Sequence, residues 1–426
     1  MSSESDTLVG GVSGGMKAAK KLGSMGAAAR EALVAIEAKT AAHVGAGWWG
    51  VSEDLEGNVV NLRRPQKRML GEKGEDACYH VMSRTVGGEV FFDDVEKEAL
   101  KKLIWKMARF SMVRVVTYAV MGNHFHVLAV VPDAEKALAK FREPGGEELL
   151  LKHISCLYSR NAVDEFAQQL KRLGERGQEK ARAELIERML ARMCDISRFM
   201  NAVKVRFTRW YNKRHERRGT LWMSRFKSVL IGSDEAMRNV ALYIELNPVR
   251  AGLVDDPVAY RWCGWAEAEV GGSRRARRGI CKAVDCPVDS WERGDDRARE
   301  TYRKLIAYVI ERELAARYEE ARSAVERGEA TREQRLLVRA GRPEVDSEQP
   351  GVTKYLLRRT RYFSDSVVIG TKSFVEHAHE RYAECFSPRR KTFATKMRDP
   401  RGDGRIADEA HYTLKNLVKR VWGSQF

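Results

Sequence analysis

Two histidines separated by one residue, His124 and His126, are the residues of this chain best suited to chemistry. They lie between two apolar runs, Val113–Met121 and Val127–Val131, and the Gly122-Asn123 pair between the runs predicts a β-hairpin turn. Alternate residues of a strand point to the same face, so the two imidazoles are expected side by side. Such a pair suits a divalent metal ion, and the alternative is a pair of hydrogen-bonded histidines within a sheet.

A second candidate pair lies more than a hundred residues further along the chain. Tyr243 and Asn247 are four residues apart at the end of an expected helix, so they share one helix face. A phenol and a carboxamide oxygen on one face suit a nucleophile and a third metal ligand. The alternative is ordinary: a tyrosine in the core and an asparagine that stops the helix before Pro248.

The segment from Lys204 to Lys227 mixes cations with aromatic rings. Cations neutralise phosphates and rings stack on unpaired bases, so this mixture favours single-stranded or hairpin nucleic acid. The alternative is a solvated helix face above a core stripe that includes Phe207 and Trp210. The residues expected to contact nucleic acid are Lys204, Arg209, Lys213, Arg214, Arg217, Arg218, Arg225 and Lys227.

Composition supports a basic, nucleic-acid-binding protein. The 426 residues carry a net charge of +17, and 43% of them are hydrophobic, enough for a real core. We find no apolar run of about 18 residues and no secretory signal. The seven cysteines lack metal-site spacing and are expected to be free thiols. We therefore expect a cytoplasmic, nucleoid-associated protein.

The expected elements alternate between strands and helices and predict an α+β fold, an antiparallel sheet with helices packed on it. Strands are expected at Tyr79–Arg84, on both sides of Gly122-Asn123 and at Arg225–Ile231. Helices are expected at Asp93–Phe110, at Asp195–His215 and from Ser233 or Asp234 to about Leu246.

Composition also divides the chain into four parts. Residues 1–70 are rich in Gly and Ala and are expected to be disordered, and residues 76–268 form the main domain with a helical insertion at about 133–191. Residues 269–340 are expected to be a basic linker, at Ser273–Arg278, followed by charged helices. Residues 341–426 are expected to form a small, mainly helical C-terminal domain that is a candidate for DNA binding.

Four motifs of residues 76–268 together resemble the REP-associated tyrosine transposases, relatives of the insertion-sequence single-tyrosine transposases. The motifs are YHV (79–81) with Ser83-Arg84, NHFHVL (123–128), RWYNKRHERRGTLWMSRFKSVLI (209–231) and YIELNPVRAGLVDDPVAYRWCGW (243–265). The insertion and the run RYFSDSVVIGTKSFVE (361–376) are similar to a large-bodied subgroup. Cys263-Gly264 departs from the usual Ser-Ser or Ser-Gly, outside the expected chemistry.

The resemblance implies the ferredoxin-like HUH fold and a metal-dependent single-stranded DNA endonuclease and strand transferase that acts on palindromic hairpins. It implies that His124 and His126 bind Mg²⁺ or Mn²⁺, with Asn247 as a third ligand, and that Tyr243 forms a 5′-phosphotyrosine bond. His80, on the first strand, is expected to be structural, and the alternative is a third imidazole near the pair. The sequence leaves open a domesticated protein that binds hairpins without cutting, a replication initiator or relaxase, and a monomer or a homodimer.

Overall fold

The computed structural model describes residues 52–53, 59–60, 68–343, 361–383, 394–397 and 411–415. The chain forms two compact units, residues 1–66 and 67–426. In the first unit, β1 (Ser52–Glu53) pairs antiparallel with β2 (Val59–Val60). The disorder expected for residues 1–70 falls almost entirely outside the described residues.

One seven-stranded sheet organises the second unit, as far as the described residues show. Its strand order is β4-β5-β3-β6-β7-β9-β8, and neighbouring strands are antiparallel except β6 and β7, which are parallel. The α+β prediction is therefore confirmed, with the correction that the sheet is mixed. The strands are β3 (Ala77–Arg84), β4 (Arg114–Val120), β5 (His124–Val131), β6 (Lys227–Ile231), β7 (Ser366–Gly370), β8 (Thr395–Lys396) and β9 (Tyr412–Lys415).

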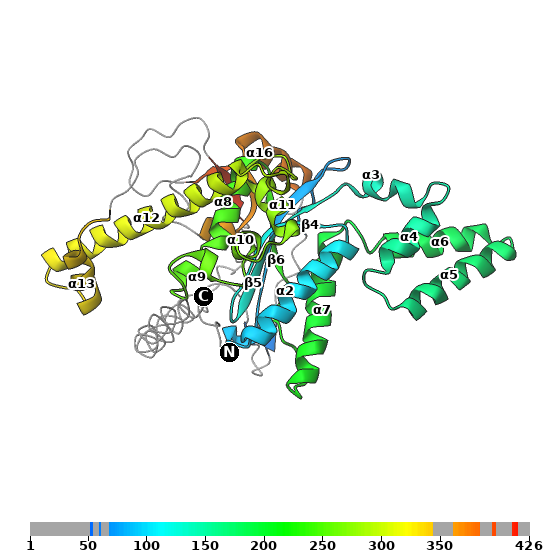
Figure 1. Cartoon of the computed structure of the whole chain (residues 1–426), viewed down its shortest axis with the longest axis horizontal. Helices are drawn as coiled ribbons and strands as arrows, with labels where there is room; N and C mark the ends of the chain where they lie inside the picture. Colours follow the sequence, from blue (N-terminus) through cyan, green and yellow to red (C-terminus); the bar gives the residue numbers. More distant parts are fainter. Residues whose placement is uncertain are drawn as a thin grey trace, which may run out of the picture. The chain divides into compact units, whose positions relative to one another are not determined.

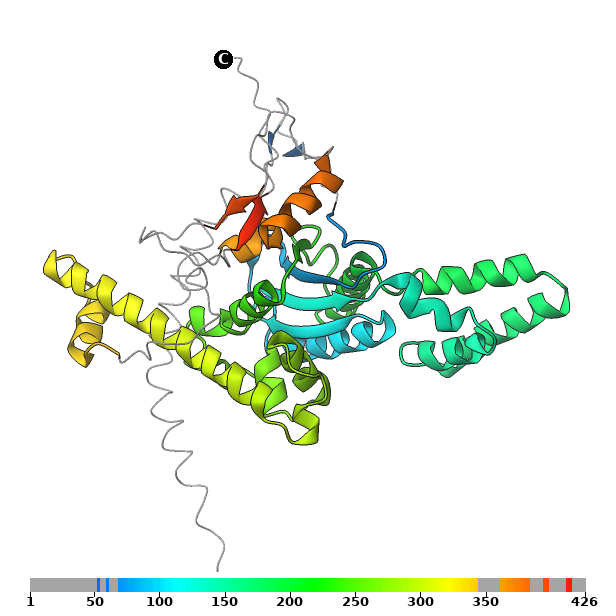
Figure 2. The same ribbon diagram turned by 90° about the horizontal axis from the view of Figure 1, so that it is seen from above.

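Different helices cover the two faces of this sheet (Figures 1 and 2). Helices α2 (Asp94–Phe110) and α7 (Ile196–Arg214) pack together on one face, where Phe125 of β5 meets Trp222 at a ring distance of 5.4 Å. Helix α8 (Asp234–Glu245) packs on β4 and β5 from the other face. Consecutive residues of β5 therefore face different environments.

The helices begin where the sequence supplies N-caps. The side chains of Asp93, Asp195 and Ser233 accept hydrogen bonds from the first free backbone N–H groups of α2, α7 and α8. The predicted helix positions are confirmed. Helix α8 ends at Glu245, and Asn247 opens a separate short helix, α9 (Asn247–Arg250).

The expected linker at Ser273–Arg278 is wrong, because this segment is helical. Helix α11 (Arg274–Ala283) packs on β4 with Ala276, Ile280 and Cys281 buried. Gly279 permits the contact, since a Cβ there would lie 2.1 Å from the carbonyl oxygen of Val116. The buried residues of α11 form a narrow stripe at helical spacing. The many basic residues between them made the segment resemble a linker in the sequence.

The remaining helices form the insertion, the segment after the main motifs and the C-terminal region. The insertion holds α3 (Ala134–Leu138), η2 (Ala139–Phe141), α4 (Gly146–Ile154), α5 (Arg160–Glu175) and α6 (Glu179–Leu190). The others are η1 (Val86–Gly88), η3 (Pro257–Ala259), α10 (Gly264–Glu269), η4 (Trp291–Arg293), α12 (Arg297–Glu326), α13 (Arg332–Ala340), α15 (Arg361–Asp365) and α16 (Lys372–Arg381). None of the helices in the described part of the chain has both the length and the apolar character needed to cross a membrane.

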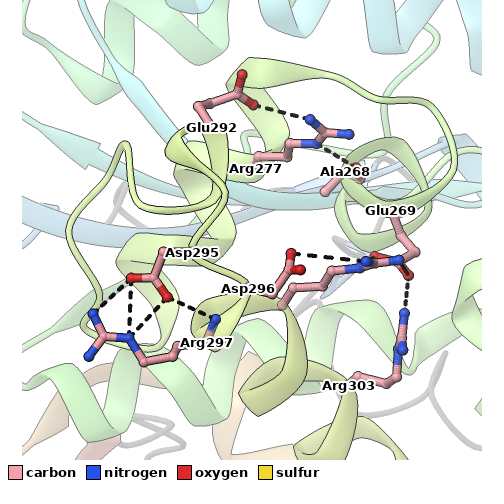
Figure 3. Close-up of polar contacts among 9 residues, drawn as sticks. Ala268, Glu269, Arg277, Glu292, Asp295, Asp296, Arg297 and Arg303 are labelled. Carbon is pink, nitrogen blue, oxygen red and sulfur yellow. Dashed lines mark hydrogen bonds and ion pairs between the residues drawn. The ribbon is translucent and has the colours of Figure 1, made fainter.

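Ion pairs hold the long helix α12 against the sheet domain. Glu269, at the end of α10, accepts hydrogen bonds at 2.8 Å from Arg299 and is also paired with Arg303 (Figure 3). Near its middle, α12 carries Glu313, whose Oε1 lies 2.7 Å from Nη2 of Arg250. The ion pairs of Glu269 with Arg299 and Arg303 therefore help to hold α12 where its Glu313 can pair with Arg250, close to the end of α8.

Candidate active site

Three histidines and an arginine share the α8 face of the sheet. In the β3–β5 pairing, Met82 lies opposite His126 and Arg84 lies opposite His124. Alternation along β3 therefore puts His80 on the same face as His124 and His126. The sequence prediction that His124 and His126 lie side by side agrees with their ring centroids, which are 5.1 Å apart.

A chain of hydrogen bonds fixes which nitrogen of His126 carries the proton. His80 Nδ1 lies 2.9 Å from the carbonyl oxygen of Phe363, which can only accept, so this nitrogen carries the hydrogen. Neutral His80 then has an accepting Nε2, which lies 2.9 Å from His126 Nδ1. His126 must donate there, and its own Nε2 keeps a lone pair.

His124 is fixed in the same way by its neighbour Asn123. The amide nitrogen of Asn123 donates to the carbonyl oxygen of Gly88 at 2.7 Å, so its Oδ1 faces His124 Nδ1 at 2.6 Å. His124 donates from Nδ1 and keeps the lone pair on Nε2. Both histidines therefore present the tautomer that binds a metal through Nε2, held by partners of the kind found around metal ligands.

The environment keeps these imidazoles neutral. Burial lowers the pKa of His80 to about 4, and burial with the nearby charge of Arg84 lowers the pKa of His124 to about 3. The pKa of His126 is also lowered, chiefly by burial. Neutral imidazole is the form that coordinates metals.

Tyr243 lies against the histidines, as the sequence prediction requires. Its ring meets His80 and His126 edge-on, with centroid distances of 5.8 Å to each. Its other neighbour is Phe363, whose ring stacks on it at 5.3 Å and 27°. The tyrosine is only 8% exposed, so it is held in one place between the sheet and the C-terminal region.

Opposing effects act on the phenol of Tyr243. Burial raises the pKa of Tyr243, and the negative charge of Asp365 adds to this effect, while the positive charge of Arg250 and a hydrogen bond with the Ser364 side chain lower it; the net shift is upward. The guanidinium carbon of Arg250 lies 5.5 Å from the centre of the tyrosine ring, and Glu313 of α12 holds this guanidinium. Arg250 is therefore the cation of this site that favours the ionised form of Tyr243.

Asn247 is near Tyr243 but has a structural contact. Its side-chain nitrogen donates to the carbonyl oxygens of Tyr243 and Ile244, at 2.9 and 3.3 Å, and so closes the end of α8. The described residues contain no cluster of three or more His, Cys, Asp and Glu side chains placed to hold a metal ion. The donors that fit a metal are the two Nε2 atoms of His124 and His126, and the role of Asn247 stays a prediction.

Sequence reasoning missed the contribution of Phe363 and Ser364, and it favoured a structural role for His80 over that of a third imidazole near the pair. The polar run Ser364-Asp365-Ser366 directly before an apolar strand is a signal for a site at the strand end, but its partner lies 120 residues away. The sequence pattern contains nothing that pairs it with Tyr243.

The basic residues expected to contact nucleic acid fall into two groups. One group has partners within the chain: Lys204 donates to the Ser224 carbonyl oxygen, Arg214 pairs with Glu96, Arg217 donates to the Thr220 carbonyl oxygen, and Lys227 lies 3.7 Å from Asp365. Burial lowers the pKa of Lys204 to about 8. The other group, Arg209, Lys213, Arg218 and Arg225, consists of exposed residues, and of these Arg225 also interacts within the chain.

Arg209 belongs to a groove that the sequence did not predict. The groove has a volume of about 290 Å³ and is lined by Arg192, Arg198, Arg206 and Arg209, together with Asn201 and Ser111 among others. None of the described residues that line it is acidic. Arg192 is held in place by the hydroxyl of Tyr158 and lies 5.5 Å from the ring centre of Phe110.

No protein-family profile and no curated protein sequence matches this chain. Among solved structures, the chain is similar to a REP-associated tyrosine transposase bound to a REP hairpin. The two are 13% identical, the match covers 50% of this chain and 87% of that one, and the TM-score is 0.30. This likeness is distant, and no assignment of activity is drawn from it.

Proposed function

We propose that this chain is a metal-dependent single-stranded DNA endonuclease and strand transferase that cuts hairpin DNA through a phosphotyrosine bond at Tyr243. The observation that carries the proposal is the His124–His126 pair, with ring centroids 5.1 Å apart, next to the buried Tyr243, whose ring centroid lies 5.8 Å from that of His126. The buried histidines His80 and His126 lie on the sheet face next to the buried Tyr243 of α8, and burying such groups is costly unless they have partners or a use. Here His80 and Asn123 accept hydrogen bonds from Nδ1 of His126 and His124, and both imidazoles therefore keep the Nε2 lone pair that a metal ion would need.

His124 and His126 would hold a divalent cation, Mg²⁺ or Mn²⁺. When bound, such a cation offsets the negative charge that develops on a phosphate during displacement. His80 and Asn123 keep the two imidazoles in the required tautomers. Asn247 is the predicted third ligand, and the other coordination positions would be open to oxygen ligands from the DNA or from water.

Tyr243 supplies the nucleophile in this proposal. Its Oη forms a bond to the phosphorus while the bond to the 3′-oxygen breaks, and the leaving 3′-oxygen takes up a proton. Arg250 favours the ionised phenol. The phosphotyrosine keeps the energy of the cleaved bond, so a later 3′-hydroxyl can reverse the step and join strands without ATP.

The arginine groove on α7 is the candidate phosphate track. Arg198, Arg206 and Arg209 follow one exposed stripe, and eleven residues of helix cover about 16 Å, several phosphates of a strand. The α2–α7 face is opposite the α8 face. A hairpin stem held at the groove would therefore have to send its single strand around the sheet edge to reach Tyr243.

The test is a covalent-adduct assay on a labelled hairpin oligonucleotide with Mn²⁺. Tyr243→Phe is expected to abolish the adduct while hairpin affinity stays within about twofold, because the phenol contributes to chemistry and not to phosphate binding. An adduct that persists in Tyr243→Phe would refute the nucleophile. Hairpin binding without any wild-type adduct would favour the non-cleaving alternative.

A further inference from the structure

Helix α12 lies outside the four motifs of the sequence, and one of its glutamates reaches the end of α8. The buried residues Tyr302, Ile306 and Val309 form a stripe along α12 at helical spacing. This stripe packs into the core, where the ring of Tyr302 meets that of Trp265 at 5.3 Å. Glu313 follows Val309 by four residues and therefore continues the stripe by one turn. A charged side chain, only 12% exposed, thus stands where the pattern favours an apolar one.

The partner of Glu313 is Arg250, the last residue of α9. Oε1 of Glu313 accepts hydrogen bonds from Nε and Nη2 of Arg250, at 3.0 and 2.7 Å. Nη1 of the same guanidinium donates to the carbonyl oxygen of Tyr243 at 3.3 Å. Because these contacts are made on different edges of a planar group, they fix both its position and its orientation. The Arg250 side chain is only 17% exposed, so the pair is largely shielded from water.

The guanidinium that Glu313 holds lies over the ring of Tyr243. Its carbon atom is 5.5 Å from the centre of that ring. A cation at this place favours the phenolate form of the tyrosine and the negative charge of a phosphate that approaches it. An arginine side chain without a fixed partner has many rotamers, so its charge would spend less time at this place. The effect of the charge therefore depends on the residue that holds it.

We propose that Glu313 is a positioning residue of the active site, which acts on the reaction by holding the Arg250 guanidinium over Tyr243. Here Tyr243 is the nucleophile of the proposed function, on which the inference rests. The proposal makes α12 a part of the active site. The ion pairs of Glu269 with the first turns of α12 support it, because they anchor the helix that carries Glu313. The alternative is an ion pair that only fastens α12 to the sheet domain.

A double-mutant cycle separates these two roles. Adduct formation is followed in single turnover, at saturating hairpin DNA with Mn²⁺. Arg250→Met, which keeps an apolar stem without the charge, is expected to slow it about 100-fold, and Glu313→Leu about 10-fold. In the Arg250→Met background, Glu313→Leu is expected to change the rate by less than about twofold, because the group through which Glu313 acts is gone. The double variant also replaces both charges by apolar side chains and so keeps the fold.

Two further variants complete the kinetic arm. Glu313→Gln keeps an oxygen that can accept from Arg250 and is expected to recover part of the rate lost in Glu313→Leu. The matched control is Glu326→Gln, since Glu326 pairs with Arg322 at 3.0 Å on the exposed surface of the same helix. This control is expected to react at the wild-type rate. An equal slowing by Glu313→Leu in both backgrounds, or no slowing with Arg250 present, would overturn the inference.

A spectroscopic arm separates this inference from the function on which it rests. Protein labelled with 3-fluorotyrosine gives ¹⁹F resonances, of which the Tyr243 signal is identified by its absence in Tyr243→Phe. Glu313→Leu is expected to move this signal when Arg250 is present and not in the Arg250→Met background. If the wild type forms no adduct, the proposed function fails, and the ¹⁹F signal still decides whether Glu313 acts on Tyr243 through Arg250. If the wild type is active and the signal does not move, the positioning role is refuted while the nucleophile stands.

Discussion

Phe125 and its neighbours His124 and His126 are consecutive residues of one strand, and they serve opposite purposes. Phe125 points into an apolar layer with Trp222 and has no exposed surface. The histidines point to the α8 face, where each has a polar partner. One face of the sheet supplies stability, and the other holds groups that are costly to bury.

The contrast extends beyond this strand. The α2–α7 face has an aromatic core in which Phe92 and Phe207 meet at 5.3 Å. The α8 face buries His80, His126, Tyr243 and Glu245. Buried ionisable groups that lie together and are hydrogen-bonded are typical of functional sites. An aromatic layer, in contrast, needs no role beyond packing in the core.

The largest expected difference is between neighbouring substitutions in β5. Phe125→Ala should lower the free energy of unfolding by about 3–5 kcal/mol, since it removes a fully buried ring and leaves a cavity. His124→Ala should change it by less than about 1 kcal/mol, because His124 is partly exposed, yet should bring cleavage to background and weaken Mn²⁺ binding at least about 100-fold.

Urea unfolding measures the stability of both variants, and electron paramagnetic resonance of Mn²⁺ measures metal binding. A destabilised His124→Ala with unchanged Mn²⁺ affinity would mean that His124 is a structural residue. Both faces of β5 would then serve packing.

The next effect concerns Glu245, which is buried on the α8 face. One carboxylate oxygen accepts from Thr117 and from the Trp265 backbone N–H, and the other has no hydrogen-bond partner among the described residues. Burial raises the pKa of Glu245 to about 7. Between pH 4.5 and 7 the folded protein keeps a proton that the unfolded chain loses, so this residue should lower stability as the pH rises, by roughly 3 kcal/mol in total.

Unfolding free energies of wild type and Glu245→Gln over pH 5–7 test this expectation. The buried histidines act in the opposite direction, because their pKa values are lowered, so the difference between the two proteins is the readout. Glu269→Gln is the control: its pKa is lowered by Arg299, and its contribution is lost only as the pH falls below about 4.5. A pH-independent difference for Glu245→Gln would mean that the carboxyl is ionised throughout.

The smallest effect is expected on the α7 surface. Replacing Arg198, Arg206 and Arg209 by Ala should weaken hairpin binding and reduce the slope of log affinity against log salt by about 2–3, one for each lost phosphate contact. The control removes three cations from α5, with Arg160, Lys171 and Arg172 replaced by Ala. Equal effects of the two variants would show that only the net charge of the protein matters, and that the groove is not the site of phosphate binding.

Local patterns were sufficient for the elements and for part of the site. The two-residue period of β5 put His124 and His126 on one face, and the helix predicted to run to about Leu246 carries Tyr243, which lies against His126. Asn247 lies at the predicted helix end, where its side-chain nitrogen donates to the Tyr243 carbonyl oxygen, and its role as a metal ligand stays a prediction.

The remaining features depend on pairings between distant segments. The parallel β6–β7 contact joins residues more than a hundred positions apart, and no local period encodes it. The role of Phe363 follows only from that pairing. The basic groove was missed for a related reason, since Arg192 comes from outside α7 and joins Arg198 and Arg206 only after folding. The helix α11 was missed because its many arginines made the segment resemble an exposed linker.

The central prediction is that the residue that carries DNA is Tyr243. Wild-type protein incubated with Mn²⁺ and a hairpin oligonucleotide should yield, after proteolysis and mass spectrometry, one peptide with a nucleotide phosphate attached, and the modified residue should be Tyr243. A covalent adduct on a different tyrosine would contradict the account, even if cleavage itself occurs.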